Sequence, residues 1–98
     1  MSKIRILLVD DDASLLQMLE DGIGMFCIDC QVTSTTDSLS ALEKLRLQPF
    51  DLVLTDYDMP GMNGLELAQT VRQALPNTRV VLMSAYGDGA TFKHRIRA

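Results

Sequence analysis

Short apolar runs alternate with longer amphipathic stretches along this chain, and this alternation constrains its fold more than any other feature. Strands are predicted at four runs: Lys3–Val9, Cys30–Ser34, Phe50–Thr55 and Thr78–Met83. The first and third are apolar over most of their length, as expected of strands that are covered on both faces. Buried strands joined by helices form parallel sheets with right-handed connections. The pattern therefore predicts one α/β domain.

The stretches between the runs carry apolar residues at helical spacing. We expect helices that begin after Asp12, at Asp37 or Ser38, at Gly64 and near Ala90. Asp12 is a favourable N-cap, because its side chain can accept hydrogen bonds from the free backbone N–H groups of a first helical turn. The third helix should end at Leu75, where Pro76 and Asn77 follow. The fourth has no stop signal before Ala98.

The composition indicates a globular chain and argues against several classes of function. Of its 98 residues, 47% are hydrophobic and 22% are charged, which is typical of a small folded domain. The net charge is -4, and the basic cluster Lys93–Arg97 fits a solvated helix face, so we expect no direct binding of nucleic acid. No apolar run approaches the roughly 20 residues that cross a bilayer, and the first run is too short for a signal peptide. A soluble, cytoplasmic protein is expected.

The only two cysteines, Cys27 and Cys30, have C-x-x-C spacing. A zinc site would lack ligands, because there is no second cysteine pair and the single histidine, His94, is far away in the sequence. A redox pair is an alternative, but thioredoxin-like motifs usually follow a strand and open a helix. Here a helix is predicted to end and a strand to begin. We therefore expect reduced, partly packed thiols.

Polar side chains follow three of the predicted strands at their carboxyl ends. Asp10 and Asp11 follow the first strand, Asp56 the third and Ser84 the fourth. Ligands of open parallel sheets bind at this edge. Carboxylates gathered there would repel one another without a cation, and Mg²⁺ suits a site of few carboxylates, water and phosphate oxygen. A carboxylate beside such a cation can attack a phosphoryl group and form an acyl phosphate.

Each of these residues also has an ordinary structural interpretation. Asp10 and Asp11 alone would fit two exposed aspartates in a turn, Asp56 a solvated acid that closes a strand, and Ser84 a turn hydroxyl. Three methionines nearby are expected to be packing or loop residues rather than metal ligands, namely Met59, Met62 and Met83.

Three sequence blocks, in order and at strand ends, make the chain recognisable. They are Ile6–Asp12, Asp51–Gly64 and Val80–Ala85. The second block contains the motif Asp-x-x-Met-Pro-Gly-x-x-Gly, which begins at Asp56 and includes Asp58. Over its whole length the chain resembles the receiver domain of bacterial two-component response regulators. The resemblance implies a flavodoxin-like parallel sheet of strand order 2-1-3-4 with helices on both faces.

The resemblance also implies a role for each polar residue at the carboxyl edge. Asp56 matches the residue that is phosphorylated, and Asp11 matches a direct ligand of Mg²⁺. Asp10 would hold the metal through water, and Asp58 would offer it a backbone carbonyl. Ser84 matches the hydroxyl that binds a phosphoryl oxygen.

The remaining residues of these blocks are expected to shape the site rather than to react. Pro60, Gly61 and Gly64 would shape the loop after Asp56, because glycine adopts backbone angles closed to other residues. Asp12 is more simply explained as a helix cap than as a ligand. The partner would be a histidine kinase or a phosphotransfer protein. The chain would not be an enzyme, beyond phosphorylation and dephosphorylation of itself.

Part of the family pattern is missing from these 98 residues. The resemblance leads us to expect a fifth strand, a lysine at its end and a final helix, and we interpret residues 1–98 as a receiver domain truncated before them. Lys93 falls in the predicted fourth helix and does not match that lysine. Without a fifth strand the fourth would have an unpaired edge, and Val81 or Met83 would be uncovered. We therefore expect homo-oligomers formed through this strand and face.

Two other functions are left open by the sequence. A truncated receiver could serve only as an interaction or assembly unit, without phosphotransfer. Alternatively, Asp56-Tyr57-Asp58 could be the D-x-D motif of a Mg²⁺-dependent phosphohydrolase similar to haloacid dehalogenases. The following Met59-Pro60-Gly61 fits that class poorly.

Overall fold

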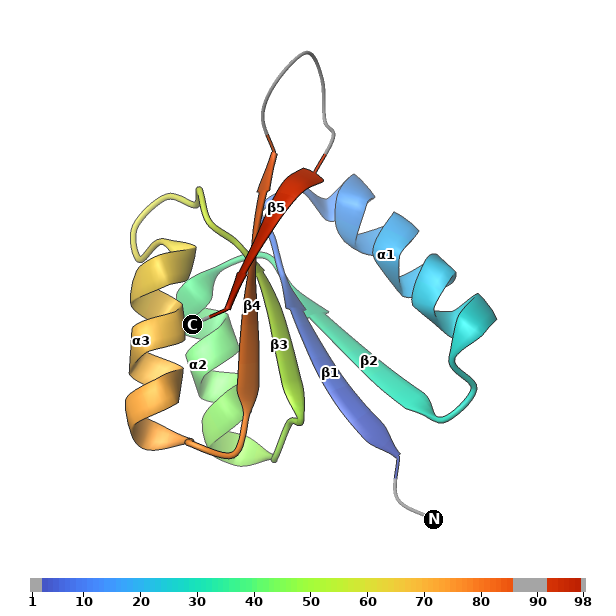
Figure 1. The fold of residues 1–98 in the computed structure, drawn as a ribbon, viewed down its shortest axis with the longest axis horizontal. Helices are drawn as coiled ribbons and strands as arrows, with labels where there is room; N and C mark the ends of the chain where they lie inside the picture. The colour runs from blue at the N-terminus through green and yellow to red at the C-terminus, as the bar shows by residue number, and fades with distance from the viewer. Residues whose placement is uncertain (1–2, 86–91, 98) are drawn as a thin grey trace.

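The chain forms one α/β unit, and the computed structural model describes residues 3–85 and 92–97. The elements follow in the order β1 (Ile4–Val9), α1 (Ala13–Phe26), β2 (Cys30–Thr35), α2 (Ser38–Leu47), β3 (Leu52–Asp56), α3 (Gly64–Ala74), β4 (Arg79–Ala85) and β5 (Phe92–Arg97). Figure 1 shows them in sequence colours. The prediction is within two residues at both ends of β1, β2, β3, β4 and α3. It is equally close at the starts of α1 and α2.

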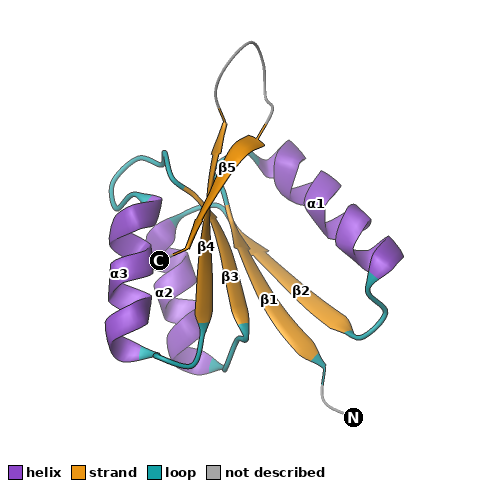
Figure 2. Cartoon of the chain, viewed as in Figure 1, coloured by secondary structure: helices purple, strands orange, loops and turns teal. Residues whose placement is uncertain are grey.

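The strands form one sheet of order β2-β1-β3-β4-β5. The first four are parallel, with Ile6 opposite both Val32 and Leu52, and Leu54 opposite Val81. As Figure 2 shows, α1 lies on one side of the sheet, whereas α2 and α3 pack together on the other. The predicted order 2-1-3-4 with helices on both faces is therefore confirmed for the parallel strands.

The C-terminal segment differs from the prediction. Phe92–Arg97 is a strand that pairs antiparallel with β4, with Leu82 opposite Ile96, so the predicted helix is wrong for these residues. Its predicted start near Ala90 lies outside the described residues. A helix of so few residues is marginal on its own, while β4 offers backbone partners along a whole edge. The parallel fifth strand of the family pattern is absent from the described residues, as predicted, because the parallel strands have the order 2-1-3-4 and β5 is antiparallel. The prediction of an unpaired β4 edge is wrong, because β5 pairs with that edge.

Neighbouring residues of β1 supply two separate cores, because side chains alternate between the two faces of a strand. Leu7 and Val9 are fully buried against α2 and α3, in a cluster that includes Val53. On the other face, Ile6 and Leu8 form a smaller cluster with Leu16 of α1. Burial of each large aliphatic side chain contributes about 1.5–3 kcal/mol, so the α2–α3 side holds the larger share of the core.

Capping residues place the start of every helix at the carboxyl edge of the sheet. The Asp12 carboxylate accepts from the backbone N–H groups of Ser14 and Leu15 at 2.9 and 3.2 Å, as predicted for α1. The Asp37 side chain caps α2, and Asn63 forms a capping box with Glu66 at α3. Each cap satisfies N–H groups that have no partner inside the helix. Among the described residues, no helix is long and apolar enough to cross a membrane.

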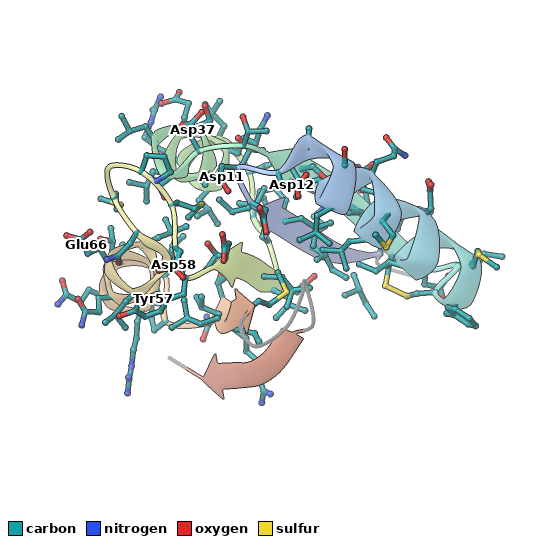
Figure 3. All side chains as sticks on the ribbon, turned by 90° about the horizontal axis from the view of Figure 1, so that it is seen from above. Asp11, Asp12, Asp37, Tyr57, Asp58 and Glu66 are labelled. Atoms are coloured by element: carbon teal, nitrogen blue, oxygen red, sulfur yellow. A yellow bond between two sulfur atoms is a disulfide. The ribbon has the colours of Figure 1, made fainter. Side chains whose placement is uncertain are left out.

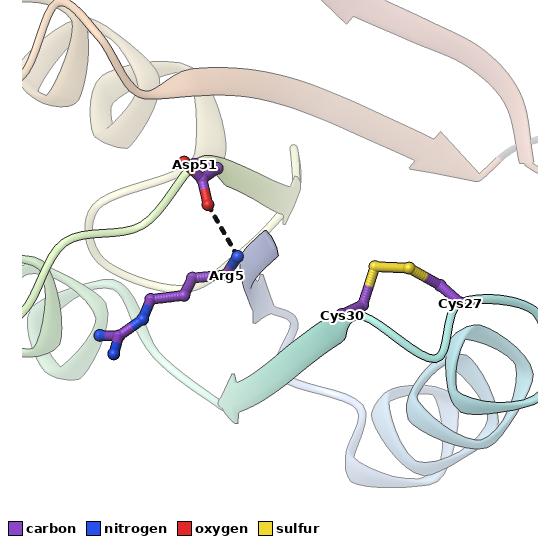
Figure 4. The surroundings of a disulfide bond; sticks show 4 residues. All are labelled: Arg5, Cys27, Cys30 and Asp51. Atoms are coloured by element: carbon purple, nitrogen blue, oxygen red, sulfur yellow. Dashed lines mark hydrogen bonds between the residues drawn. A yellow bond between two sulfur atoms is a disulfide. The ribbon is translucent and has the colours of Figure 1, made fainter. Parts of the chain in front are cut away.

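The expectation of reduced thiols is wrong in this structure. Cys27 and Cys30 form a disulfide, with their Cα atoms 5.4 Å apart (Figure 4). Cys27 is the C-cap of α1 and Cys30 is the first residue of β2. The short turn between the two elements brings the sulfur atoms together, which the spacing alone left undecided.

Candidate acidic site at the carboxyl edge of the sheet

Parallel pairing of β1 with β3 brings distant acidic residues together. Val9 lies opposite Thr55, so Asp10, which follows β1, lies beside Asp56 at the end of β3. One carboxylate oxygen from each of Asp10, Asp11 and Asp56 lies within 4.8 Å of the others. Figure 3 looks onto this edge, where Asp11 and its neighbours gather. An arrangement on opposite sides of the sheet would have excluded a shared site.

Asp10 is the most buried of the three acids, with 3% of its surface exposed. Burial first, and then the negative charges of Asp56 and Asp11, raise the pKa of Asp10 from 3.8 to about 6, although the backbone N–H of Asp12 acts in the lowering direction. That N–H donates to Oδ1 of Asp10 at 2.8 Å. The first turn of α1 therefore holds the Asp10 carboxylate in place.

Asp56 is half-buried and shares this electrostatic environment. Burial raises the pKa of its carboxyl group, and the charges of Asp11 and Asp58 act in the same direction. The backbone N–H of Asp58, 3.4 Å from Oδ1 of Asp56, and that of Tyr57 lower it. The negative charges at this edge thus oppose one another, and a cation would relieve that repulsion.

The donors present fit a hard divalent cation. They are carboxylate oxygens from three side chains, close enough to share one ion, and Mg²⁺ prefers oxygen ligands of this kind. Among the described residues, no other group of histidine, cysteine, aspartate or glutamate side chains has this arrangement. Asp12 is engaged in capping α1, so its side chain serves the helix.

The contacts predicted for the Ser84 hydroxyl and the Asp58 carbonyl are not among those of the described residues. Ser84 follows Met83, which is the β4 partner of Asp56, so its backbone lies near the site. The side chain of Ser84 lies outside the described part of the chain, and its predicted hydroxyl contact stays a prediction. The predicted role of the Asp58 carbonyl also stays a prediction, since its recorded contact with Asp56 is through N–H.

The loop after Asp56 requires glycine at two positions. Gly61 has a φ of 75°, in the left-handed region that favours glycine. A Cβ atom at Gly64 would lie 2.1 Å from the backbone oxygen of Asp56, so no larger residue fits without movement. The N–H of Gly64 also donates to the carbonyl of Tyr57 at 2.9 Å. The start of α3 is thus packed directly on the end of β3, whereas Pro60 is exposed.

Sequence reasoning missed two contacts that hold this loop. The Ser38 hydroxyl, at the start of α2, donates to the carbonyl of Met62 at 2.7 Å. The backbone N–H of Tyr57 donates to the carbonyl of Met83 at 2.8 Å. Neither contact has a local signal, because each joins segments far apart in the chain. Met59 and Met83 are buried, as expected of packing residues, so the prediction that Met83 could be left uncovered is wrong.

The chain matches known proteins along most of its length. The family model described as the response regulator receiver domain matches residues 6–98. The response regulator protein PilR of Pseudomonas aeruginosa is 36% identical over 98 residues, which cover 100% of this chain and 22% of PilR. The chain therefore spans less than a quarter of the length of this relative.

Solved structures agree with the sequence comparison. The signal receiver domain of an HD domain-containing protein from Pseudomonas fluorescens superposes with a TM-score of 0.80 at 28% identity, covering 88% of this chain and 67% of that one. The chemotaxis response regulator CheY4 of Vibrio cholerae gives 0.75 at 28% identity, covering 83% and 68%. With the matching family model and the acids at the expected strand ends, these likenesses show that the chain belongs to the response regulator receiver domain family, a family of two-component signalling modules.

Proposed function

We propose that this receiver domain accepts a phosphoryl group on Asp56, with Mg²⁺ held by Asp10, Asp11 and Asp56. The observation that carries the proposal is the approach of the three carboxylates to within 4.8 Å of one another. Three acids at this distance are unfavourable alone, and they become useful where a cation and a phosphoryl group must be bound together.

The Asp56 carboxylate is the nucleophile of the proposed reaction. One of its oxygens forms a bond to phosphorus while the bond from phosphorus to the donor nitrogen of a phosphohistidine breaks, and the product is an acyl phosphate on Asp56. Bound Mg²⁺ would supply positive charge that offsets the charge of the transferred phosphoryl group. Later attack by water on phosphorus would release phosphate and restore the carboxylate, which is the self-dephosphorylation that we propose.

The neighbouring residues position this nucleophile. The backbone N–H groups of Asp58 and Tyr57 lower the pKa of Asp56 and so favour the ionised form that attacks. The N–H of Asp12 holds the Asp10 carboxylate, which has an oxygen within 4.8 Å of oxygens of Asp11 and Asp56. Asp10 would then hold the cation through water, and Asp11 directly. The Asp58 carbonyl would be a further ligand, and the Ser84 hydroxyl would bind a phosphoryl oxygen.

The proposed donor is a histidine kinase or a phosphotransfer protein, because both carry phosphohistidine. The matched region is 22% of the length of PilR, so the output and further domains of such a response regulator are not assigned to this chain. A cytoplasmic location and the absence of direct nucleic acid binding are also proposals.

Intact-mass spectrometry after treatment with a small phosphodonor and Mg²⁺ tests the proposal. We expect a gain of one phosphoryl group that maps to Asp56 and disappears in Asp56→Asn or when Mg²⁺ is chelated. Asp29→Asn is the matched control, because Asp29 is an exposed acid on the turn after α1, outside the acidic site.

Three results would reject the phosphoacceptor. Modification of Asp56→Asn as fast as the unmodified chain would place the reaction elsewhere. Absence of any phosphoryl gain, with Mg²⁺ still bound, would leave an interaction unit without phosphotransfer. Steady turnover of a phosphate ester that depends on Asp56 and Asp58 would indicate a phosphohydrolase.

A further inference from the structure

Side-chain contacts anchor helix α1 from its start to Ile23. Its start is capped by Asp12, and Leu16 is buried in the cluster on that face of the sheet. One turn later, the Glu20 carboxylate accepts a hydrogen bond from the Ser34 hydroxyl of β2. Ile23 is the last residue of the helix that packs against the cluster. These contacts hold α1 from the acidic site to Ile23.

Beyond Ile23 the helix makes little contact with the rest of the chain. Met25, Phe26 and Ile28 are 78%, 87% and 88% exposed. Gly22 and Gly24 weaken the helix, because glycine in a helix interior leaves the backbone freer than alanine would, and open space surrounds both positions. From Gly24 to Asp29, Cys27 is the one residue that is not exposed.

The disulfide adds a covalent anchor to the hydrogen bond that the Asp29 carbonyl, in the turn after α1, accepts from the Ile4 N–H at 2.8 Å. Cys27 lies at the end of α1, while Cys30 packs against the cluster of Ile6, Leu8 and Leu16. Cys30 also lies opposite Ile4 in the β1–β2 pairing. As Figure 4 shows, the bond therefore ties the end of a weakly held helix to the edge of the sheet.

We propose that Cys27 and Cys30 form a reversible redox latch that holds the last turns of α1 against the sheet. Reduction takes two electrons and two protons from a dithiol. A thiolate of the reductant attacks one sulfur of the pair, so that a mixed disulfide forms, the Cys27–Cys30 bond breaks and the other cysteine leaves as a thiol. The second thiol of the reductant then attacks the mixed disulfide, which frees the remaining cysteine and leaves the reductant as a cyclic disulfide. A disulfide oxidant such as oxidised glutathione reverses the change and leaves as two thiols. This proposal is independent of phosphoryl transfer on Asp56.

The position of the pair makes it a target of thiol–disulfide exchange rather than a catalyst of it. Catalytic pairs place a cysteine at a helix N-terminus, where the helix dipole stabilises a thiolate. Cys27 lies at a helix C-terminus, whose carbonyl groups disfavour negative charge on sulfur, and Asp29 adds a further negative charge between the two cysteines. Both cysteines are only half-buried, so a dithiol supplied from outside can reach them.

Hydrogen exchange measured by mass spectrometry on the complete chain tests the latch. After oxidation with oxidised glutathione and then reduction with dithiothreitol, we expect the backbone amides of residues 22–27 to exchange about tenfold faster. The amides of residues 14–18 and of β1 should keep their rates, because other contacts hold them. Return to oxidised glutathione should restore the slow exchange.

Variants separate the latch from other effects of the reagents. The double variant Cys27→Ser with Cys30→Ser should exchange at the fast rate in both reagents. Ile28→Ser keeps both cysteines and alters an exposed residue between them, so it should respond to dithiothreitol as the unmodified chain does. Alkylation of free thiols, read by intact mass, reports the state of the pair in each sample.

The proposal fails if the amides of residues 22–27 exchange at the same rate in the oxidised and the reduced chain, once alkylation has verified the thiol state of each sample. It also fails if oxidised glutathione leaves both thiols open to alkylation. Faster exchange throughout β1 and α1 on reduction would show that the disulfide supports the whole fold, and would overturn a latch confined to the end of α1.

Discussion

At the scale of single residues, the surroundings of Asp10 disfavour its ionised form in the folded chain, and a bound cation would favour that form. Its carboxylate is buried beside two other acids, and these surroundings favour the protonated form. The strand ends made this meeting of acids predictable, since parallel strands deliver their carboxyl ends to one edge. The burial of Asp10 and its bond to the N–H of Asp12 were not predictable, because they depend on how α1 leaves the sheet.

The stability of the cation-free chain should therefore depend on Asp10. Its pKa is about 6 in the fold against an ordinary value of 3.8, so between these values the folded chain binds more protons than the unfolded chain. Stability is then lost as the pH rises through this window. The Asp10→Asn variant has no carboxyl group to titrate at this position, so it does not lose stability in this way. Above about pH 6 it should be more stable than the unmodified chain by on the order of 1–3 kcal/mol.

Urea unfolding of both chains with a chelator, at several pH values, measures this difference. Mg²⁺ should reduce or reverse it, because the cation stabilises the ionised acids of the unmodified chain. A difference that stays constant from pH 4 to pH 8 would show that Asp10 does not titrate in this window.

Gly64 should tolerate no side chain. In Gly64→Ala the added Cβ would meet the Asp56 carbonyl, so the start of α3 or the end of β3 must move. We expect a loss of about 2–4 kcal/mol in the free energy of unfolding and weaker Mg²⁺ binding. Gly22→Ala is the matched control, because its Cβ enters open space in a helix and should stabilise the chain by about 0.5–1 kcal/mol. Equal effects of the two variants would contradict the close contact at Gly64.

At the scale of helices and strands, local sequence signals determined seven of the eight elements in the structure. Asp12, Asp37 and Asn63 mark helix starts by side chains that accept from backbone N–H groups, and such signals can be read without a fold. The strand β5 has no such local signal. It forms through pairing with β4, a non-local contact, and weak helix periodicity in the same residues misled the prediction.

Variants of Asp12 at the start of α1 test whether its side chain caps the helix or binds the metal. Asp12→Asn keeps an oxygen that can accept from the N–H groups of Ser14 and Leu15, so stability should change little. Asp12→Ala removes that acceptor and should cost about 1 kcal/mol. Mg²⁺ affinity should fall less than about threefold in Asp12→Asn, because the lost charge acts from outside the group of ligands. Calorimetric titration that shows a tenfold loss or more would make Asp12 a ligand.

At the scale of the whole molecule, pairing of β5 with β4 changes what the chain exposes. The predicted route to homo-oligomers was an open edge of β4, and in the structure β5 occupies that edge. The other proposed route is the face on the α1 side of β3 and β4, where Leu54 and Val81 are only half-buried. Self-association of the full chain stays a proposal that rests on this face.

Removal of residues 92–98 should make the chain associate more strongly. The shortened chain exposes the backbone groups of β4 that β5 now pairs, and an unprotected edge pairs readily with another copy. Sedimentation velocity at equal concentrations of the two chains measures the difference. Identical sedimentation of both, with the fold of each retained by circular dichroism, would contradict the protective role of β5.

The most direct test of the acidic site is a crystal structure of the chain grown with Mg²⁺ and beryllofluoride, a mimic of the phosphoryl group. We predict metal density at about 2.0–2.1 Å from carboxylate oxygens of Asp11 and Asp56, with beryllofluoride bonded to Asp56. Density for the metal at other residues, or a free Asp56 beside an ordered metal, would contradict the account.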